Sequence, residues 1–376
     1  MKIIRTSKCY FNKWLTKKKL RELDEILKEY ARICNYFVEN YENDIPQLSK
    51  YDLDKTANIH KCIEDTKTFL SVRLVRQAFH EAYGNVRSAK SNVKNKNGYY
   101  RPIFDGHSML LSENSCIHEI SQHICLFDYF AKLRCLRKDK GIGYSINIPL
   151  KRHKQFNKWM NLGQICKSVV VTNKYILFSF EIETGPKKEV GSLVGFDFGM
   201  KRLGTVSNGN VIGTDIFSHL QELHQKKKCS KGYYRKKEEI KEYINREIKN
   251  IDFSDKKLVV VEALKNMKYK MKERGRLSKN IRSFFYDLSY SQVLNRVEML
   301  CEENRVTFRS VSPYYTSQEC SHCGHIEKAN RKSQESFICQ KCGYSDNADL
   351  NASKVILKRF VMGTYGSHYQ QEYLNS

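Results

Sequence analysis

The sequence contains no run of apolar residues long enough to cross a bilayer, which needs about 20 of them. No secretory signal opens it, and no internal repeat is visible. These absences argue against a membrane-spanning, a secreted and a repeat protein. At 376 residues, the chain is long enough for two or three domains that each have a core.

Acidic residues are too few to balance the basic ones. The chain has 66 Lys and Arg against 41 Asp and Glu, which gives a formal net charge of +25. Such a surplus predicts a polyanionic partner, and nucleic acid is the usual one. Lysine-rich chains also arise from AT-rich genomes, which accounts for a share of the excess. A membrane surface is the other partner of basic proteins, but no basic amphipathic anchor stands out.

Regularly spaced cysteines are missing from most of the chain. Of 13 cysteines, nine are scattered singly, a pattern that suits a reducing cytosol or nucleus. The other four form two Cys-x-x-Cys pairs separated by fifteen residues, namely Cys320, Cys323, Cys339 and Cys342. This spacing predicts a zinc ribbon, with disulfide pairing as the alternative. We interpret His322 and His325 as surface or nucleic-acid contacts, because four cysteines already satisfy zinc.

The first half of the sequence changes from helical to strand-like patterns. Helices are predicted at about 16–43 and 66–94, from the helical spacing of their apolar residues. The second carries the basic residues Arg73, Arg76, Arg87 and Lys90, a plausible phosphate-tracking face. Strands are predicted at 99–103, 143–150, 168–172 and 174–183, with a helix at 116–136 and a linker at 185–188.

The second half has the clearest order of elements. Strands are predicted at 193–198, 203–207 and 211–216, and Asn208-Gly209 is a hairpin turn between the last two. A charged helix over about 218–250 carries the basic residues Lys226, Lys227, Lys228 and Arg235. A buried strand, a helix, a strand and a final helix follow at 258–262, 283–304, 306–311 and 349–360.

Three acids occupy particular points in this order. Asp197 lies inside the first apolar strand, Glu262 ends the fourth strand, and Asp349 begins the last helix. If the first strand lies beside the fourth, all three can converge, and divalent cations would then be needed to neutralise them. Singly, each acid has an ordinary interpretation, since Asp197 could be a structural aspartate, Glu262 a surface acid and Asp349 a helix cap.

Five motifs in this half resemble the TnpB family, the RNA-guided nucleases of insertion sequences, whose relatives include compact type V CRISPR effectors and the Fanzor proteins. The motifs are Gly195-Phe196-Asp197-Phe198-Gly199, Val260-Val261-Glu262-Ala263-Leu264, Thr316-Ser317-Gln318-Glu319-Cys320-Ser321-His322-Cys323-Gly324, Cys339-Gln340-Lys341-Cys342-Gly343-Tyr344 and Asp349-Leu350-Asn351-Ala352. The last motif favours Asp349 as the third acid, with Asp346 as the fallback. The sequence departs from the family in two respects. Relatives often have an arginine before the aspartate that corresponds to Asp349, where this chain has Ala348. The stretch between 211 and 258 is also short for the family.

The resemblance implies a multidomain α/β protein with a RuvC nuclease domain of RNase H-like fold and an inserted zinc ribbon. A β-barrel-like wedge module with an inserted helical recognition domain would precede them. The implied boundaries are 1–11 and 97–188 for the wedge module, 12–96 for the recognition domain, 189–315 and 346–362 for the RuvC domain, 316–345 for the ribbon and 363–376 for a flexible tail.

The resemblance also implies the chemistry and the partners. Asp197, Glu262 and Asp349 would bind two Mg²⁺ ions, and the four cysteines would bind a structural Zn²⁺ ion. A guide RNA and a double-stranded target DNA would be the partners, with sequence read by base pairing. The same residues leave open a guided repressor without cleavage, a transposase and a compact type V CRISPR effector. We expect a cytoplasmic, nucleoid-associated location in a prokaryote, or a nuclear one in a eukaryote.

Overall fold

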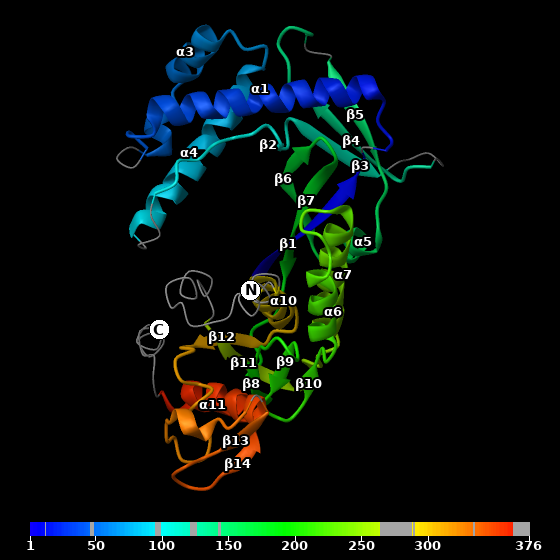
Figure 1. Ribbon diagram of the computed structural model, residues 1–376. Helices are drawn as coiled ribbons and strands as arrows, with labels where there is room; N and C mark the ends of the chain where they lie inside the picture. The colour runs from blue at the N-terminus through cyan, green and yellow to red at the C-terminus, as the bar shows by residue number, and fades with distance from the viewer. Residues whose placement is uncertain are drawn as a thin grey trace. The chain divides into compact units, whose positions relative to one another are not determined.

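The computed structural model forms two compact units, Lys2–Glu183 and Met1 with Thr184–Ser376 (Figure 1). The structure describes residues 1–11, 13–45, 49–94, 99–120, 126–141, 144–263, 288, 290–333 and 335–363. The tail predicted over 363–376 and the start of the helix predicted over 283–304 lie almost wholly outside these ranges.

The first unit contains two antiparallel sheets. One has the strand order β1-β7-β6-β2 and the other the order β3-β4-β5. The strands of the first sheet are β1 (Lys2–Tyr10), β2 (Ser108–Leu111), β6 (Gln164–Thr172) and β7 (Tyr175–Glu183). Those of the second are β3 (Cys116–Ile120), β4 (Tyr129–Arg134) and β5 (Ser145–Leu150).

Helices of this unit follow the apolar spacing of the sequence. They are α1 (Lys17–Tyr41), α2 (Lys50–Leu53), α3 (Thr56–Thr66), α4 (Val72–Lys94) and α5 (Lys154–Leu162). Thr16 caps α1 by accepting a hydrogen bond from the Lys19 amide. The apolar stripe of α1 then packs against α4 in one core that also includes residues of both sheets.

The second unit is built on a mixed sheet with the strand order β10-β9-β8-β11-β12. Its strands are β8 (Ser192–Asp197), β9 (Gly204–Val206), β10 (Val211–Ile212), β11 (Lys256–Glu262) and β12 (Thr307–Val311). Its helices are α6 (Ile216–His224), α7 (Lys231–Lys249), α10 (Tyr290–Glu303) and α11 (Ala348–Met362). A small hairpin, β13 (Ser336–Ile338) and β14 (Ser345–Asn347), follows the short helix η1 (Lys328–Asn330).

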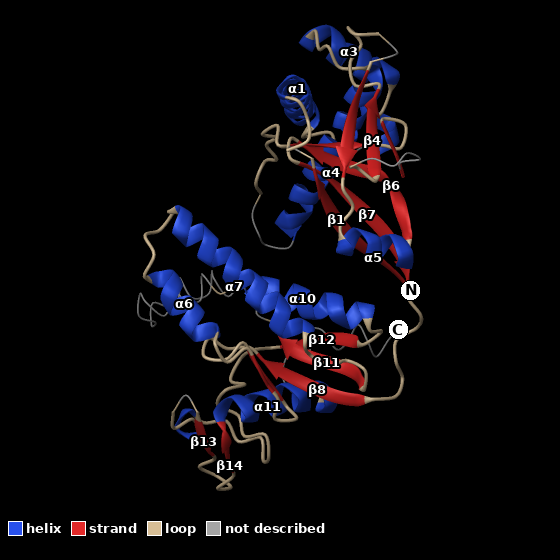
Figure 2. Ribbon diagram, turned by 90° about the vertical axis from the view of Figure 1, so that its right-hand side faces the viewer, coloured by secondary structure: helices blue, strands red, loops and turns tan. Residues whose placement is uncertain are grey.

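The two faces of this sheet are covered by different helices, as Figure 2 shows. Phe196 and Val261 point into the core formed with α6, α7 and α10. Leu258 and Val260 face the other way, where they meet Ile356 of α11. Because side chains alternate along a strand, the sheet presents one set of positions to each layer of helices.

Several sequence predictions are confirmed in this unit. The predicted first and fourth strands, β8 and β11, are parallel neighbours with Phe196 opposite Val261. Asn208-Gly209 joins the antiparallel pair β9 and β10, and Gly209 has φ +94°, a conformation that glycine adopts without strain.

Two predictions in the first unit are wrong. The expected helix at 116–136 is the hairpin of β3 and β4, in which the buried residues Tyr129, Ala131 and Leu133 alternate with more exposed ones. The segment 99–103 forms no strand, because its apolar side chains have no core to face; Tyr100 and Ile103 are 75% and 83% exposed.

Two predicted helices differ from the structure in their extent. The charged stretch 218–250 is two helices, because Cys229 takes a left-handed φ of +63° and Ser230 then caps α7 by accepting from the Tyr233 amide. The helix predicted over 66–94 begins only at Val72, since Thr66 ends α3 and Lys67 is left-handed.

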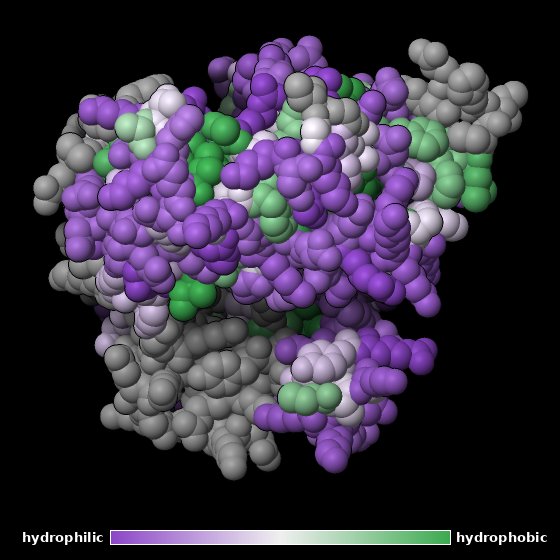
Figure 3. All heavy atoms as spheres, turned by 90° about the horizontal axis from the view of Figure 1, so that it is seen from above, coloured by the Kyte–Doolittle hydropathy of each residue, from purple (hydrophilic) through white to green (hydrophobic). Residues whose placement is uncertain are grey.

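Hydrophilic residues make up most of the coloured surface in Figure 3. None of the helices in the described parts of the chain combines the length and the apolar character that crossing a membrane requires.

Candidate functional site

Asp197 and Glu262 lie at the ends of neighbouring parallel strands. In the register of β8 and β11, Phe196 is opposite Val261, so the two acids come next on both strands. Phe196 and Val261 point to the α10 face, and alternation therefore turns Asp197 and Glu262 toward the α11 face. The topology brings together two acids that are 65 positions apart in the sequence.

Asp349 reaches the same place from the first turn of α11. Asn347 caps this helix and accepts hydrogen bonds from the amides of Asp349 (3.1 Å) and Leu350 (3.2 Å). A carboxylate in the first turn also has a favourable interaction with the helix dipole. The helix packs closely on β8, since an added Cβ at Gly195 would lie 2.2 Å from the Ser353 carbonyl oxygen.

Glu262 and Asp349 lie close enough to Asp197 to interact with it electrostatically. Burial raises the pKa of Asp197 well above its usual value, and the charges of Glu262 and Asp349 raise it further. Burial also raises the pKa of Glu262. Carboxylates arranged in this way repel one another unless protons or cations neutralise them, and hard divalent cations prefer such oxygen ligands.

Asp346, the alternative third acid, has its own partners. Its Oδ2 accepts from Lys354 Nζ at 2.8 Å and from the Tyr344 hydroxyl at 2.7 Å. Burial disfavours the charge of Asp346, but these hydrogen bonds outweigh it and lower its pKa. Of the two alternatives, Asp349 is the acid whose charge acts on Asp197, whereas Asp346 is engaged by Lys354 and Tyr344.

Three further side chains lie at this site, and sequence reasoning gave none of them a role. Arg331 Nη2 lies 3.1 Å from Asp349 Oδ1, and the positive charge of Arg331 partly opposes the rise in the pKa of Asp197. Thr316 donates a hydrogen bond to Glu262 Oε1. Tyr290, at the start of α10, is close enough that Asp197 and Glu262 add to the effect of burial and raise its pKa. Only Thr316 belongs to a motif that the sequence analysis had singled out.

The four cysteines of the ribbon form one cluster. Each offers a sulfur atom, and these atoms all lie within 4.8 Å of one another. Cys320 Sγ is 3.8 Å from Cys342 Sγ, and Cys323 Sγ is 3.6 Å from Cys339 Sγ, distances that exclude disulfide bonds in this arrangement. Burial opposes ionisation of Cys339, but donors from its own turn outweigh it and lower its pKa to about 6. The cluster could therefore hold a metal ion.

The glycines and histidines around this cluster take different parts. Gly324 and Gly343 have φ of +76° and +72°, so both knuckles use the left-handed turn that glycine permits. His322 stacks on the Tyr344 ring at 5.7 Å, and His325 Nε2 lies 3.0 Å from Glu327 Oε2. Neither histidine belongs to the metal-binding group of side chains.

The basic residues predicted to contact nucleic acid are divided between the two units. They differ in whether each side chain has a partner within the protein. On α4, Arg76 is paired with Asp54, and Lys90 lies over the Tyr99 ring. On the same helix, Arg73 donates to the Asn114 carbonyl at 3.3 Å and Arg87 donates to the Tyr83 hydroxyl at 3.5 Å, which are long distances for hydrogen bonds. In the second unit, Arg235 is paired with Glu239. The exposed turn between α6 and α7 carries Lys226, Lys227 and Lys228.

Comparison with known proteins locates the resemblance in the second unit. Residues 290–356 match the family model described as Cas12f1-like, TNB domain. This segment begins at α10, includes β12 and all four cysteines, and ends within α11. It therefore covers Asp349 but neither Asp197 nor Glu262.

Curated relatives extend the match over other parts of the chain. The Escherichia coli strain K12 protein InsQ, designated an RNA-guided DNA endonuclease, is 28% identical over 51% of this chain and 56% of its own. A Cas12f1 endodeoxyribonuclease of Sulfoacidibacillus thermotolerans is 38% identical over 19% of this chain and 17% of its own. A TnpB-like protein of Aquifex aeolicus strain VF5 is 33% identical over 29% and 36%. The matched part of the chain thus spans about half the length of InsQ and less than half the length of the other two relatives.

Solved structures with similar folds cover most of the chain. A Cas12f1–sgRNA–target DNA complex matches with a TM-score of 0.59 at 16% identity, over 91% of this chain and 83% of the other. The mini-RNA-guided endonuclease Cas_phi3 matches with a TM-score of 0.56 at 10% identity, over 95% and 92%. At these identities the likeness establishes the fold, a mixed α/β architecture of the kind found in compact type V effectors.

Proposed function

We propose that this chain, a relative of the TnpB proteins and the Cas12f1 nucleases, is an RNA-guided endonuclease that cuts phosphodiester bonds of target DNA. The observation that carries the proposal is the approach of Glu262 and Asp349 to Asp197, from a neighbouring strand and from the first turn of a helix. The designations of InsQ and Cas12f1 support the activity, and the RNA and DNA in the Cas12f1 complex support the partners. A guide RNA would supply sequence recognition, and the protein would hold the duplex by its backbone.

The order of the elements supports a RuvC domain of RNase H-like fold. Three antiparallel strands, β8 to β10, precede the parallel strands β11 and β12, and helices cover both faces of the sheet. We assign 189–315 and 346–362 to this domain and 316–345 to the ribbon inserted in it. In the first unit, the helices α1 to α4 come between β1 and the other strands of its sheet in the sequence. This order is in keeping with a wedge module at 1–11 and 97–188 and a recognition domain inserted at 12–96.

The donor atoms of the two candidate centres fit different metals. Three carboxylates, two of which raise the pKa of the third, Asp197, provide hard oxygen ligands, which suit Mg²⁺. Bound there, two Mg²⁺ ions would activate a water molecule and stabilise the leaving oxygen of the phosphodiester. Arg331 pairs with Asp349 and reduces the negative charge of the site. For the four cysteines, tetrahedral Zn²⁺ with Zn–S bonds of about 2.3 Å places sulfur atoms about 3.8 Å apart, which fits the observed 3.6 and 3.8 Å.

The test compares two aspartates three residues apart. The full chain is expressed with the DNA that flanks its gene, so that the co-purified RNA acts as guide, and is assayed on a plasmid that carries the matching target. Asp349→Asn should reduce cleavage by more than about a hundredfold and leave guided DNA binding intact, because it removes a metal ligand. Asp346→Asn is the matched control and should keep cleavage within several-fold, since Lys354 already neutralises that carboxylate.

Two outcomes would contradict the proposal. Full cleavage by the Asp349→Asn variant would remove this residue from the acidic site. A wild-type complex that binds its target in Mg²⁺ but never cuts it would indicate the guided repressor instead.

A further inference from the structure

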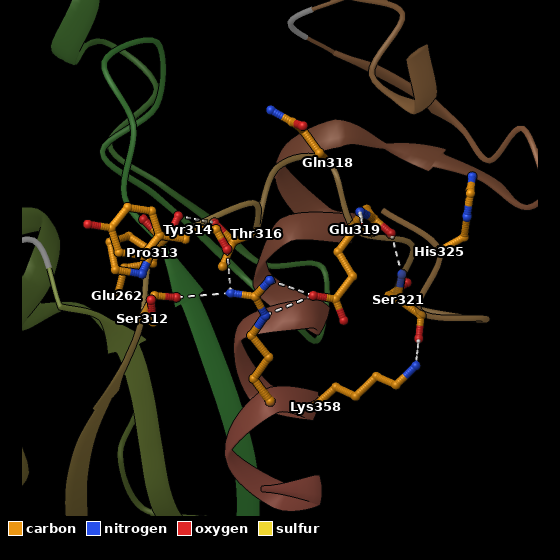
Figure 4. A network of polar contacts seen from close by, with 12 residues as sticks. Glu262, Ser312, Pro313, Tyr314, Thr316, Gln318, Glu319, Ser321, His325 and Lys358 are labelled. Carbon is orange, nitrogen blue, oxygen red and sulfur yellow. Dashed lines mark hydrogen bonds and ion pairs between the residues drawn. The ribbon is translucent and has the colours of Figure 1, made fainter. Parts of the chain in front are cut away.

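The loop between β12 and the first cysteine pair, residues 312–319, passes beside Glu262 (Figure 4). Within it, Tyr315 has φ +62°, the left-handed conformation that is unfavourable for a non-glycine residue. The amides of Gln318 and Glu319 both donate to the Tyr315 carbonyl, at 2.9 and 3.0 Å. A strained residue of this kind persists only where its surroundings hold it in place.

A single buried guanidinium holds both ends of this loop. Arg359 of α11 is only 2% exposed, and its Nε and Nη2 donate to Glu319 Oε2 at 2.8 and 2.6 Å. Its Nη1 donates to the carbonyl oxygens of Ser312 (3.0 Å) and Tyr314 (2.7 Å). A buried charge is tolerated only with partners of this quality, so the contacts fix the loop to α11.

The same helix also holds the chain just beyond the loop. Asn351 of α11 donates to the Glu319 carbonyl at 2.8 Å and accepts from the Ser321 amide at 3.0 Å. Lys358 donates to the Ser321 carbonyl at 3.0 Å, as Figure 4 shows. The helix that carries Asp349 therefore also positions the loop beside Glu262.

The loop presents the Thr316 side chain to Glu262. Thr316 is 3% exposed, and its hydroxyl has one proton, which can go to Glu262 Oε1 or to the Pro313 carbonyl oxygen at 3.2 Å. The ionised carboxylate is the stronger acceptor. Burial raises the pKa of Glu262, whereas the Thr316 hydrogen bond and the Arg359 charge oppose that rise.

We propose that Thr316 is a positioning residue that fixes the Glu262 carboxylate for a divalent cation, held in place by the buried Arg359–Glu319 pair. The inference rests on the proposed function, because it assumes that the acids bind metal. Hydrogen-bond partners of metal-binding carboxylates set their orientation, and losing one commonly weakens metal binding about ten- to a hundredfold. A purely structural Thr316, bonded only to Pro313, would affect folding and leave metal binding unchanged.

The test measures Mn²⁺ binding to the RNA-free full chain by calorimetry. Each protein is compared with its own Asp197→Ala version, so that only binding at the acidic site is counted. Thr316→Val, which keeps the shape but loses the hydroxyl, should weaken this binding roughly tenfold. Thr316→Ser, which keeps the hydroxyl, should stay within about threefold of wild type. In the RNA complex, the Mg²⁺ concentration for half-maximal cleavage should rise for valine and not for serine.

The unfolding midpoint, measured without added Mg²⁺ or Mn²⁺, separates positioning from folding. The valine variant should unfold within a few degrees of wild type. Wild-type Mn²⁺ affinity in a folded Thr316→Val variant would overturn the inference, and so would equal losses for serine and valine. If wild type shows no Asp197-dependent Mn²⁺ binding, the proposed metal site itself fails and the inference fails with it.

Discussion

At the scale of single residues, the acidic site depends on strand alternation and on unequal neutralisation. Asp197 and Glu262 point to the α11 face because Phe196 and Val261, one position earlier, point into the opposite core. Asp349 has Arg331 as an ionic partner, whereas no ion pair involving Asp197 is found among the described residues. The Asp197 charge is therefore less compensated than that of Asp349 without a metal.

The stability of the metal-free protein should depend on the Asp197 charge. Its pKa in the folded state is raised above the unfolded value of about 3.8, so protonation stabilises the fold below that pH. This stability is lost as the pH rises through the raised pKa. Asp197→Asn should therefore unfold at a higher temperature than wild type at pH 7 without divalent cations, and at a similar one at pH 3.5.

Thermal unfolding of both proteins with and without Mg²⁺ checks this. Added Mg²⁺ should raise the midpoint of wild type and leave that of Asp197→Asn nearly unchanged. A metal-free Asp197→Asn variant that is less stable than wild type at pH 7 would show that Asp197 serves the fold instead.

At the scale of elements, the close packing of α11 on β8 determines the position of Asp349. Gly195 lets the helix backbone approach so closely that an added Cβ would lie 2.2 Å from the Ser353 carbonyl and 3.0 Å from the Leu357 amide nitrogen. No side chain fits there, so glycine sets the depth at which α11 packs. The glycine before Asp197 in the Gly-Phe-Asp motif thus has a packing role, and Asp349 depends on it.

Gly195→Ala should destabilise the second unit by about 1–3 kcal/mol, because the helix must shift to make room. Since α11 carries Asp349, cleavage should fall with it. Gly204→Ala on β9 is the matched control, because its Cβ would lie no closer than 3.4 Å to the Phe198 ring and 3.7 Å from the Asp197 carbonyl oxygen. Thermal unfolding and plasmid cleavage measure both effects. Equal behaviour of the two variants would show that close packing at Gly195 is unimportant.

At the scale of the whole molecule, the positive charge is widely spread. The net charge of +25 includes many lysines that already lie beside acids, and these contribute little to the binding of phosphates. Lys226, Lys227 and Lys228, exposed in the turn between α6 and α7, differ in that no ion pair is found for them among the described residues. This turn is therefore a better candidate for phosphate contact than the average surface lysine.

Replacing Lys226, Lys227 and Lys228 by alanine should reduce the salt dependence of guide RNA binding. If all three meet phosphates, the slope of log K against log salt should become less steep by about 2–3. The control replaces Lys2, Lys28 and Lys140, which are paired with Glu181, Asp24 and Glu22. It removes the same charge and should change the slope by less than about 1. Identical slopes for both triple variants would mean that only total charge matters.

The sequence by itself predicted the cysteine cluster, which the structure confirms, and singled out the three acids that we propose as a metal site. Both depend on local spacing or on apolar patterns that are strong over a few residues, such as Cys-x-x-Cys and the buried strand before Glu262. It failed where two local patterns compete. The segment 116–136 read as a helix, but Cys116 pairs with Leu133 across a hairpin. Such pairing depends on a partner in the next strand, beyond the few residues over which a helical pattern is judged.

Tertiary structure alone decided which side chains support the acids. Thr316, Arg331 and Tyr290 come from a loop, the ribbon and α10, and nothing in their own neighbourhoods in the sequence points to Asp197 or Glu262. The buried Arg359 likewise reads as one more basic residue until Glu319 is seen beside it. Metal ligands follow from residue type and spacing, whereas the partners that orient them are fixed by contacts that exist only once the chain has folded.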